Sequence, residues 1–125
     1  MLGYVKTSNG EHSLDGQLAA LNAAGVDPRR IFTDRLNGST DKVRAGLHAM
    51  LSYARSGDVV VVAGLDRLGR SVAEVTRTVA DLSERGITLR ALKEGIDSTT
   101  STGRVVVSVL VSLAAMDLEP GRANG

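Results

Sequence analysis

The chain has 125 residues, 42% of them hydrophobic and 23% charged, with a formal net charge of +1. This composition is typical of one globular domain and excludes a disordered chain. The absence of cysteine excludes disulfides and thiolate metal sites and favours an intracellular setting. One Phe, two Tyr and no Trp argue against an aromatic platform for single-stranded nucleic acid.

The predicted strands and helices alternate along the chain, with boundaries marked by hydrophobic periodicity, polar N-caps and glycine stops. In chain order they are a strand (1–6), a helix (13–25), a strand (30–34), a polar loop (35–42), a helix (43–57), a strand (58–62), a helix (71–86), a strand (87–92), a loop (93–102) and a helix (103–119). In the last segment β-branched residues favour a strand, but its length and the preceding Ser/Thr cap favour a helix. The alternation predicts a doubly wound α/β fold around a mostly parallel sheet.

Further sequence features bear on metals and location. His12 and His48 lack ligand-like spacing, so no metal site is expected. No signal peptide opens the chain, and the longest apolar stretch, around 105–116, is too short to span a bilayer. We therefore expect a cytoplasmic protein.

Polar side chains follow three of the predicted strands. In parallel sheets, ligands bind beyond the carboxyl ends of the strands. The side chains expected there are Lys6, Thr7 and Ser8 after the first strand, Asp34 and Arg44 after the second, and Asp66, Arg67 and Arg70 after the third. Four cations, two carboxylates and hydroxyls at one edge indicate an anion-binding site, although ordinary solvated surface charges would give the same pattern.

The residue types at this edge suit a phosphodiester. An arginine fork holds two phosphate oxygens at once, and phosphoryl transfer is catalysed largely by positioning and charge stabilisation. Magnesium sites instead need a cluster of carboxylates. Here Asp66 is followed by Arg67 and Asp34 by Arg35, so a metal-free reaction is preferred.

Five short segments follow one another in an order known from a protein family. They are YVKTS (4–8), SLDGQ (13–17), IFTD (31–34), VRAGL (43–47) and LDRLGRS (65–71). In this order and nearly this spacing they resemble the N-terminal catalytic domain of serine recombinases, the resolvase/invertase family. The resemblance runs from about residue 3 to residue 116, and LDRLGRS is its most specific segment.

The resemblance implies a metal-free DNA strand exchange that needs no cofactor. A serine attacks the scissile phosphate of double-stranded DNA, becomes joined to a 5′ phosphate and releases a 3′ hydroxyl, and religation reverses the step. It also implies a homodimer, a tetramer in a synaptic complex, and association with the bacterial nucleoid. Resolution, inversion, integration and transposition are all compatible with it.

Carried over residue by residue, the resemblance assigns Ser8 as the nucleophile, with Thr7 and Ser13 as rivals on chemistry alone. Arg67 is also a candidate to protonate the leaving oxygen. The other roles are phosphate binding by Lys6, Arg44, Arg67 and Arg70, orientation of the arginines or proton transfer by Asp34 and Asp66, and support by Tyr4 and Gln17. Tyr4 fits a core position of the first strand equally well.

The chain departs from the family pattern at several positions. Lys6 replaces an arginine and so loses the bidentate grip, and Gly64 replaces a common lysine. Asp117-Leu118 stands where the family usually has Glu-Arg, and Pro120-Gly121 breaks a helix expected to continue. No helix-turn-helix segment follows, which fits either a truncated form or a natural remnant.

The final helix predicts a dimer. We expect a catalytic core at 1–102, the start of a dimerisation helix at 103–119 and a tail at 120–125. A helix apolar nearly all round needs cover from a partner. The expected interface stripe is Val106, Val109, Leu110, Leu113 and Met116.

Two other classes of protein are alternatives. A degenerate copy would keep the fold and dimerise without cleaving DNA, and Lys6, Gly64 and Leu118 favour it. Other doubly wound domains fit less well. A phosphoacceptor receiver needs paired acids after the first strand, and a flavodoxin-like protein using TSNG (7–10) needs aromatic side chains against its flavin.

Overall fold

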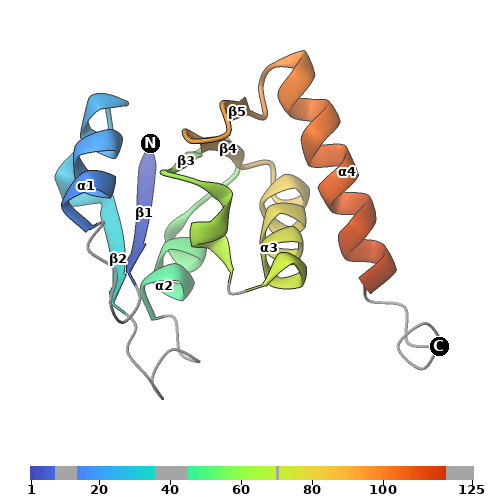
Figure 1. Cartoon of the computed structure of the whole chain (residues 1–125), viewed down its shortest axis with the longest axis horizontal. Coiled ribbons are helices and arrows are strands. Elements are labelled where there is room, and N and C mark those ends of the chain that lie inside the picture. Colours follow the sequence, from blue (N-terminus) through green and yellow to red (C-terminus); the bar gives the residue numbers. More distant parts are fainter. Residues whose placement is uncertain (8–13, 36–44, 70, 118–125) are drawn as a thin grey trace.

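Five strands form one sheet at the centre of the computed structural model, which describes residues 1–7, 14–35, 45–69 and 71–117 (Figure 1). They are β1 (Leu2–Thr7), β2 (Ile31–Arg35), β3 (Val59–Val62), β4 (Thr88–Ala91) and β5 (Ile96–Asp97), in the spatial order β2-β1-β3-β4-β5. The first four strands are parallel, which confirms the mostly parallel sheet. β5 pairs antiparallel to β4, so the prediction of a continuous loop at 93–102 was wrong.

In the described part of the chain, three α-helices cover the sheet and a fourth packs against one of them. They are α1 (Leu14–Ala23), α2 (Ala45–Tyr53), α3 (Val72–Glu84) and α4 (Ser101–Asp117), with short 3-10 helices η1 (Pro28–Arg30) and η3 (Leu65–Leu68) among the described residues. α1 packs on one face of the sheet, α2 and α3 pack on the other, and α4 packs against α3. The doubly wound α/β arrangement is therefore confirmed.

The predicted helix ends are close to the observed ones, with one exception. Ser71 caps α3 by accepting a hydrogen bond from the Glu74 N–H at 3.2 Å, as expected from the sequence. α2 ends at Tyr53, four residues before the predicted Gly57. The helical hydrogen bond from the Arg55 N–H to the Leu51 carbonyl is replaced by two others. The Arg55 N–H donates to Asp58, and the Arg85 guanidinium donates to the Leu51 carbonyl. The ambiguous segment 103–119 is helical in its described part, within α4 (Ser101–Asp117), and residues 118 and 119 lie outside the described residues.

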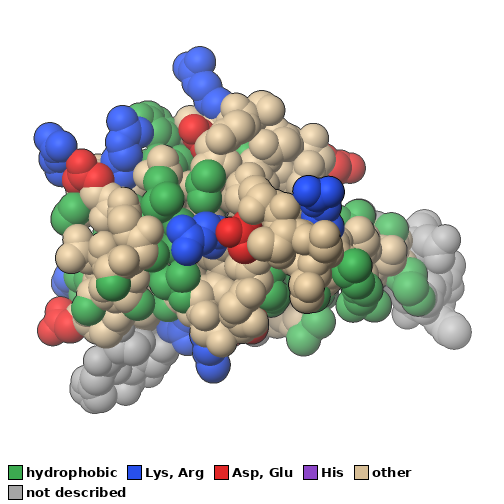
Figure 2. All heavy atoms as spheres, turned by 90° about the horizontal axis from the view of Figure 1, so that it is seen from above, with side chains coloured by type: hydrophobic (Ala, Val, Ile, Leu, Met, Phe, Trp, Pro, Cys, Tyr) green, Lys and Arg blue, Asp and Glu red, His purple; other side chains and the backbone are tan. Residues whose placement is uncertain are grey.

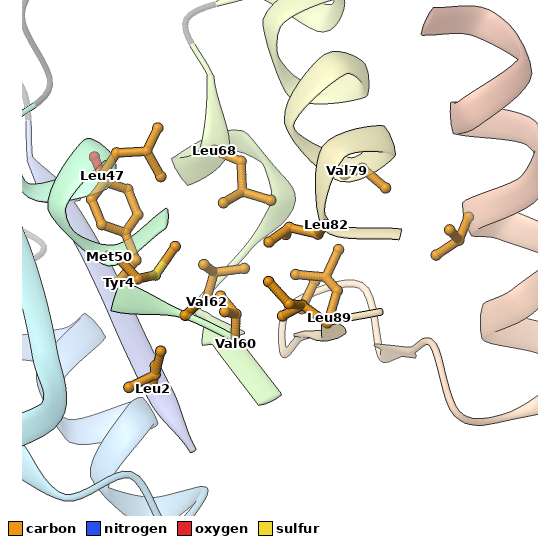
Figure 3. Close-up of a cluster of buried hydrophobic side chains, with 14 residues drawn as sticks. Leu2, Tyr4, Leu47, Met50, Val60, Val62, Leu68, Val79, Leu82 and Leu89 are labelled. Carbon is orange, nitrogen blue, oxygen red and sulfur yellow. The ribbon is translucent and has the colours of Figure 1, made fainter. Parts of the chain in front are cut away.

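The core consists of aliphatic side chains on both faces of the central strands. In the larger cluster, Val60 and Val62 of β3 meet Leu82 of α3, while Tyr4 lies beside Met50 of α2 (Figure 3). The smaller cluster joins Val5 and Val61 to α1. Val60, Val61 and Val62 are all fully buried, as expected for a strand covered on both faces. Each such side chain contributes on the order of 1.5–3 kcal/mol relative to an exposed one.

The sheet order brings the ends of β1, β2 and β3 to one edge. β1 lies between the other two, with Lys6 opposite Asp34 on β2 and Tyr4 opposite Val62 on β3. In Figure 1, β1 and β2 both run toward the lower edge of the molecule. The last residues of these three parallel strands therefore lie at one edge of the sheet, as the alternation of strands and helices predicts.

Candidate active site

Six of the residues expected at the site lie in the described part of the chain. They are Tyr4, Lys6, Gln17, Asp34, Asp66 and Arg67. Ser8, Arg44 and Arg70 lie outside the described residues, as does the rival Ser13, and their roles stay predictions. The neighbours of these positions are described, and they show how the flanking backbone is held.

The peptide of Lys6 is held by two side chains from different elements. Its N–H donates to Gln17 Oε1 at 3.1 Å, and its carbonyl accepts from Gln17 Nε2 at 2.8 Å. Arg67 Nη1 donates to the same carbonyl, also at 2.8 Å. Because β3 no longer pairs with β1 beyond Tyr4, these side chains take the place of a neighbouring strand. The backbone two residues before Ser8 is thus fixed by α1 and η3 together.

Arg67 also forms a two-pronged ion pair with its neighbour Asp66. Nη2 donates to Asp66 Oδ2 at 2.8 Å and Nε to Oδ1 at 3.3 Å. The Arg67 side chain is 16% exposed and that of Asp66 is 56% exposed, so the carboxylate faces solvent and the guanidinium faces the protein. The cation predicted beside Asp66 is confirmed.

The charges around Asp66 favour its ionised form. The hydrogen bond from Arg67 holds the pKa of the Asp66 carboxyl below its usual value. Partial burial opposes this effect, while the positive charges of Arg67, Lys93 and Lys6 reinforce it. Three cations thus act on this one carboxylate.

Asp34 is buried and serves as the N-terminal acceptor of α2. Its carboxylate accepts from the Gly46 N–H at 2.7 Å, the Leu47 N–H at 3.0 Å and the Tyr4 hydroxyl at 2.8 Å. These are its hydrogen-bond partners within the described residues, and Arg35, which follows Asp34 in the sequence, is not among them. The reason is that α2 begins next to the end of β2 and offers unpaired N–H groups. A Cβ at Gly46 would lie 2.6 Å from the Thr33 carbonyl oxygen, so this close approach requires glycine.

The core position expected for Tyr4 is confirmed, while its supporting role in the site stays a prediction. Its ring is fully buried in the core, and its hydroxyl reaches Asp34.

The outer face of α4 is apolar and exposed. Val105, Val109, Leu113 and Met116 are 42–64% exposed and form what we call the α4 patch (Figure 2). Three of them, Val109, Leu113 and Met116, belong to the interface stripe expected from the sequence. Of the other two, Val106 is half-buried and Leu110 packs partly against the core. Val107 and Ala114 form the buried side of the helix.

Sequence reasoning missed the turn after β4. Lys93 lies beside Asp66, and the Glu94 carboxylate accepts a hydrogen bond from the first residue of η3. The segment was assigned as loop, and no spacing in the sequence relates Glu94 to Leu65, 29 residues earlier.

The described residues contain no group of three His, Asp or Glu side chains placed to hold a metal ion. None of the described helices is both long and apolar enough to cross a membrane.

The fold and the site define a doubly wound α/β domain with cationic side chains fixed at the carboxyl edge of its sheet. The sequence matches the family described as Resolvase, N terminal domain, over residues 1–123. The chain therefore belongs to this family.

Relatives of this chain are named as resolvases, invertases and recombinases. The chain is 38% identical to a resolvase/recombinase of Pseudomonas putida, with 91% of the chain and 62% of the relative covered. It is 39% identical to the DNA-invertase hin of Salmonella typhimurium, covering 94% and 60%. It is 41% identical to the serine recombinase gin of Escherichia phage Mu, covering 95% and 60%. The chain thus spans about three fifths of the length of these relatives.

Solved structures show the same fold. The N-terminal catalytic domain of TP901-1 integrase superposes with a TM-score of 0.72 at 25% identity, covering 93% of this chain and 94% of that one. A resolvase family site-specific recombinase from Streptococcus pneumoniae gives a TM-score of 0.64 at 21% identity, covering 99% and 92%, and supports the fold alone.

Proposed function

We propose that this chain is the catalytic domain of a site-specific DNA recombinase, which cuts and rejoins double-stranded DNA through a serine joined to a 5′ phosphate. One observation carries the proposal. Arg67 is tied both to Asp66 and to the carbonyl of Lys6, on the strand that leads to Ser8. A guanidinium is thereby oriented beside the Lys6 backbone, two residues before the proposed nucleophile. The names of the relatives support the same reaction class.

In the proposed reaction, Ser8 Oγ attacks the scissile phosphorus and gives up its proton. The bond from phosphorus to the 3′ oxygen breaks, and that oxygen leaves as a 3′ hydroxyl after taking a proton. Arg67 and Arg70 stabilise the charge on the phosphoryl oxygens, and Arg67 is the candidate donor to the leaving oxygen. The reverse step, on a different 3′ hydroxyl, rejoins the strand. The phosphoester energy is retained in the protein–DNA bond, so the scheme uses no cofactor.

Lys6, on β1, gives the proposed site a second cation besides Arg67 of η3. Its side chain is 93% buried and lies close enough to Asp66 to lower the pKa of that carboxyl. Lysine binds a phosphate as a point charge and lacks the bidentate fork of arginine. The role of Lys6 in this scheme is thus to add positive potential, while the arginines supply the directed hydrogen bonds.

The α4 patch is proposed to be the dimer interface. Four large apolar side chains in one row are exposed on a helix that already packs against α3 through its other side. A second copy of the same helix would cover such a row symmetrically. In this proposal α4 is the dimerisation helix. It begins at Ser101, close to the boundary expected between residues 102 and 103. Two such dimers on DNA would form the tetrameric synaptic complex, and DNA binding would place the protein at the nucleoid.

Covalent trapping tests the proposed function. Incubation with a random-sequence duplex library containing nicks should yield a denaturation-resistant protein–DNA adduct. Ser8→Ala should abolish the adduct, whereas Thr7→Ala and Ser13→Ala should retain it. An adduct that persists in Ser8→Ala protein would refute the assignment of the nucleophile. DNA binding without any adduct would support the degenerate, non-cleaving alternative.

A further inference from the structure

The turn between β4 and β5 lies directly against the start of η3. The Leu65 N–H points between the two carboxylate oxygens of Glu94, at 3.1 and 3.2 Å. The Lys93 N–H donates to the Ala63 carbonyl at 2.8 Å, and the Leu92 N–H donates to the Val62 carbonyl at 3.0 Å. The pairing of β3 with β4 is therefore continued past both strands, and Glu94 is held opposite the first residue of η3.

The start of η3 has no cap of its own. The residue before it, Gly64, has no side chain to accept a hydrogen bond from the first turn. The first N–H groups of any helix lack partners within the helix and need an acceptor from elsewhere. Glu94 supplies from outside the acceptor that Gly64 cannot supply.

The residues that follow this cap are those of the candidate site. Asp66 and Arg67 come one and two positions after Leu65, and Arg67 reaches from there to the Lys6 carbonyl. The backbone of η3 is otherwise held at its start by the bond from the Arg67 N–H to the Gly64 carbonyl, at 3.1 Å. Loss of the Glu94 contact would thus let the segment that carries both side chains shift.

We propose that Glu94 is a positioning residue for Arg67, acting by capping η3 at the Leu65 N–H. The consequence for DNA cleavage rests on the proposed function, whereas the effect on the position of Arg67 does not. Glu94 acts through the backbone and does not itself touch the DNA.

The carboxylate could instead matter only through its charge. Glu94 is exposed and negative, so it would repel a DNA phosphate at the same rim. The two roles predict opposite effects of substitution. If charge alone matters, Glu94→Gln and Glu94→Ala should both strengthen DNA binding and raise the cleavage rate. If capping matters, Glu94→Ala should be impaired and Glu94→Gln, which keeps an acceptor oxygen, should be rescued.

The position of Arg67 can be tested by NMR on the whole chain without DNA. In Glu94→Ala, the Leu65 amide should exchange with solvent faster and the Arg67 Nε–H resonance should shift. Glu94→Gln should stay near wild type on both. Glu84→Ala removes another exposed glutamate, on α3, and should change neither signal. An unchanged Arg67 resonance and an unchanged Leu65 exchange rate in Glu94→Ala would overturn the proposal.

Adduct formation with the nicked duplex library then tests the consequence for cleavage. We expect Glu94→Ala to be roughly tenfold slower, the effect of losing a helix cap, at unchanged DNA affinity. Glu94→Gln and Glu84→Ala should remain within about twofold of wild type. Equal slowing in the alanine and glutamine variants would contradict the capping role. If wild type gives no adduct but the NMR effects are seen, the proposed function fails while the positioning of Arg67 by Glu94 stands.

Discussion

Arg67 Nη1 donates a hydrogen bond to the backbone carbonyl of Lys6 at 2.8 Å, although 61 residues separate them. The same guanidinium holds Asp66 through Nε and Nη2. Three N–H directions of one planar group are therefore fixed by a neighbouring carboxylate and by the strand that leads to Ser8. A flexible ammonium group could not make this set of contacts. The Arg67 guanidinium is therefore held in one orientation, unlike a freely solvated surface charge.

Removal of the Arg67 side chain should affect the reaction far more than the fold. We expect Arg67→Ala to slow adduct formation at least about a hundredfold, because one preorganised charge donor is lost. Thermal unfolding should show a loss of only about 1 kcal/mol, since Gln17 still binds the Lys6 carbonyl. Arg67→Lys should also be slow, while Arg29→Ala, an exposed arginine on η1, should behave as wild type. Normal cleavage by Arg67→Ala would show that this arginine is structural.

Gln17 should contribute chiefly to stability. Gln17→Ala leaves the buried Lys6 N–H without its acceptor, which should cost about 1–3 kcal/mol in urea unfolding. Adduct formation should slow as well, because the backbone before Ser8 loses one of its two anchors. Asn22→Ala is a suitable control, since it removes an exposed amide from the same helix. Equal stability of the two variants would contradict the account of the Lys6 peptide.

Substitutions of Asp34 and of Tyr4 should lower the free energy of unfolding by different amounts, although the two side chains share a hydrogen bond. Tyr4→Phe removes one donor from the carboxylate and should cost about 1 kcal/mol. Asp34→Asn turns an amide toward the N–H groups of α2 and removes the charge at its N-terminus, so we expect about 2–3 kcal/mol. Urea unfolding measures both values. A smaller loss in Asp34→Asn than in Tyr4→Phe would rule out the capping of α2 by Asp34.

The ion pair of Asp66 predicts a specific pH dependence of stability. The pKa of Asp66 is lowered in the folded chain, chiefly by the hydrogen bond from Arg67. Its contribution to stability is therefore present above the unfolded-state pKa of about 3.9 and is lost as pH falls through the lower folded value. The stability difference between wild type and Asp66→Asn should be constant from about pH 7 to 5 and shrink below about pH 4. It should be small throughout, because the carboxylate is more than half exposed. A stability difference between wild type and Asp66→Asn that grows as the pH falls would contradict a lowered pKa of Asp66 in the folded chain.

The α4 patch predicts concentration-dependent association. Sedimentation over about a hundredfold range of concentration should show wild type passing from monomer to dimer. The double variant Val109→Glu/Leu113→Glu should stay monomeric and folded, because charges replace two exposed apolar side chains. Thr102→Glu, on the same helix but outside the patch, should still associate. A wild type that is folded and monomeric at every concentration would refute the dimer.

The sequence predicted the sheet and its edge because those features depend on local patterns. The unbroken valine run at 59–62 indicates a strand buried on both faces, and Ser71 with Gly86 marks the ends of a helix. From the order of strands and helices alone, Lys6, Asp34 and Asp66 were expected at one edge. The pairing of Asp66 with Arg67 followed from their adjacency.

Contacts between distant segments were not predictable in the same way. β5 has two residues, too few to show an alternating pattern, and it is defined by pairing with β4. The partners of Asp34 depend on where α2 begins in space, and the cap at Leu65 depends on the register between β3 and β4. These relationships arise from tertiary packing, which a single sequence does not display.

In the proposed reaction, Ser8 forms a covalent bond with a DNA 5′ phosphate. The most direct measurement is mass spectrometry of the adduct trapped on the nicked duplex library, after nuclease and protease digestion. We expect a peptide carrying a nucleotide on Ser8 through its 5′ phosphate, together with a free 3′ hydroxyl on the released strand. A nucleotide attached to another residue, or linked through its 3′ phosphate, would contradict it.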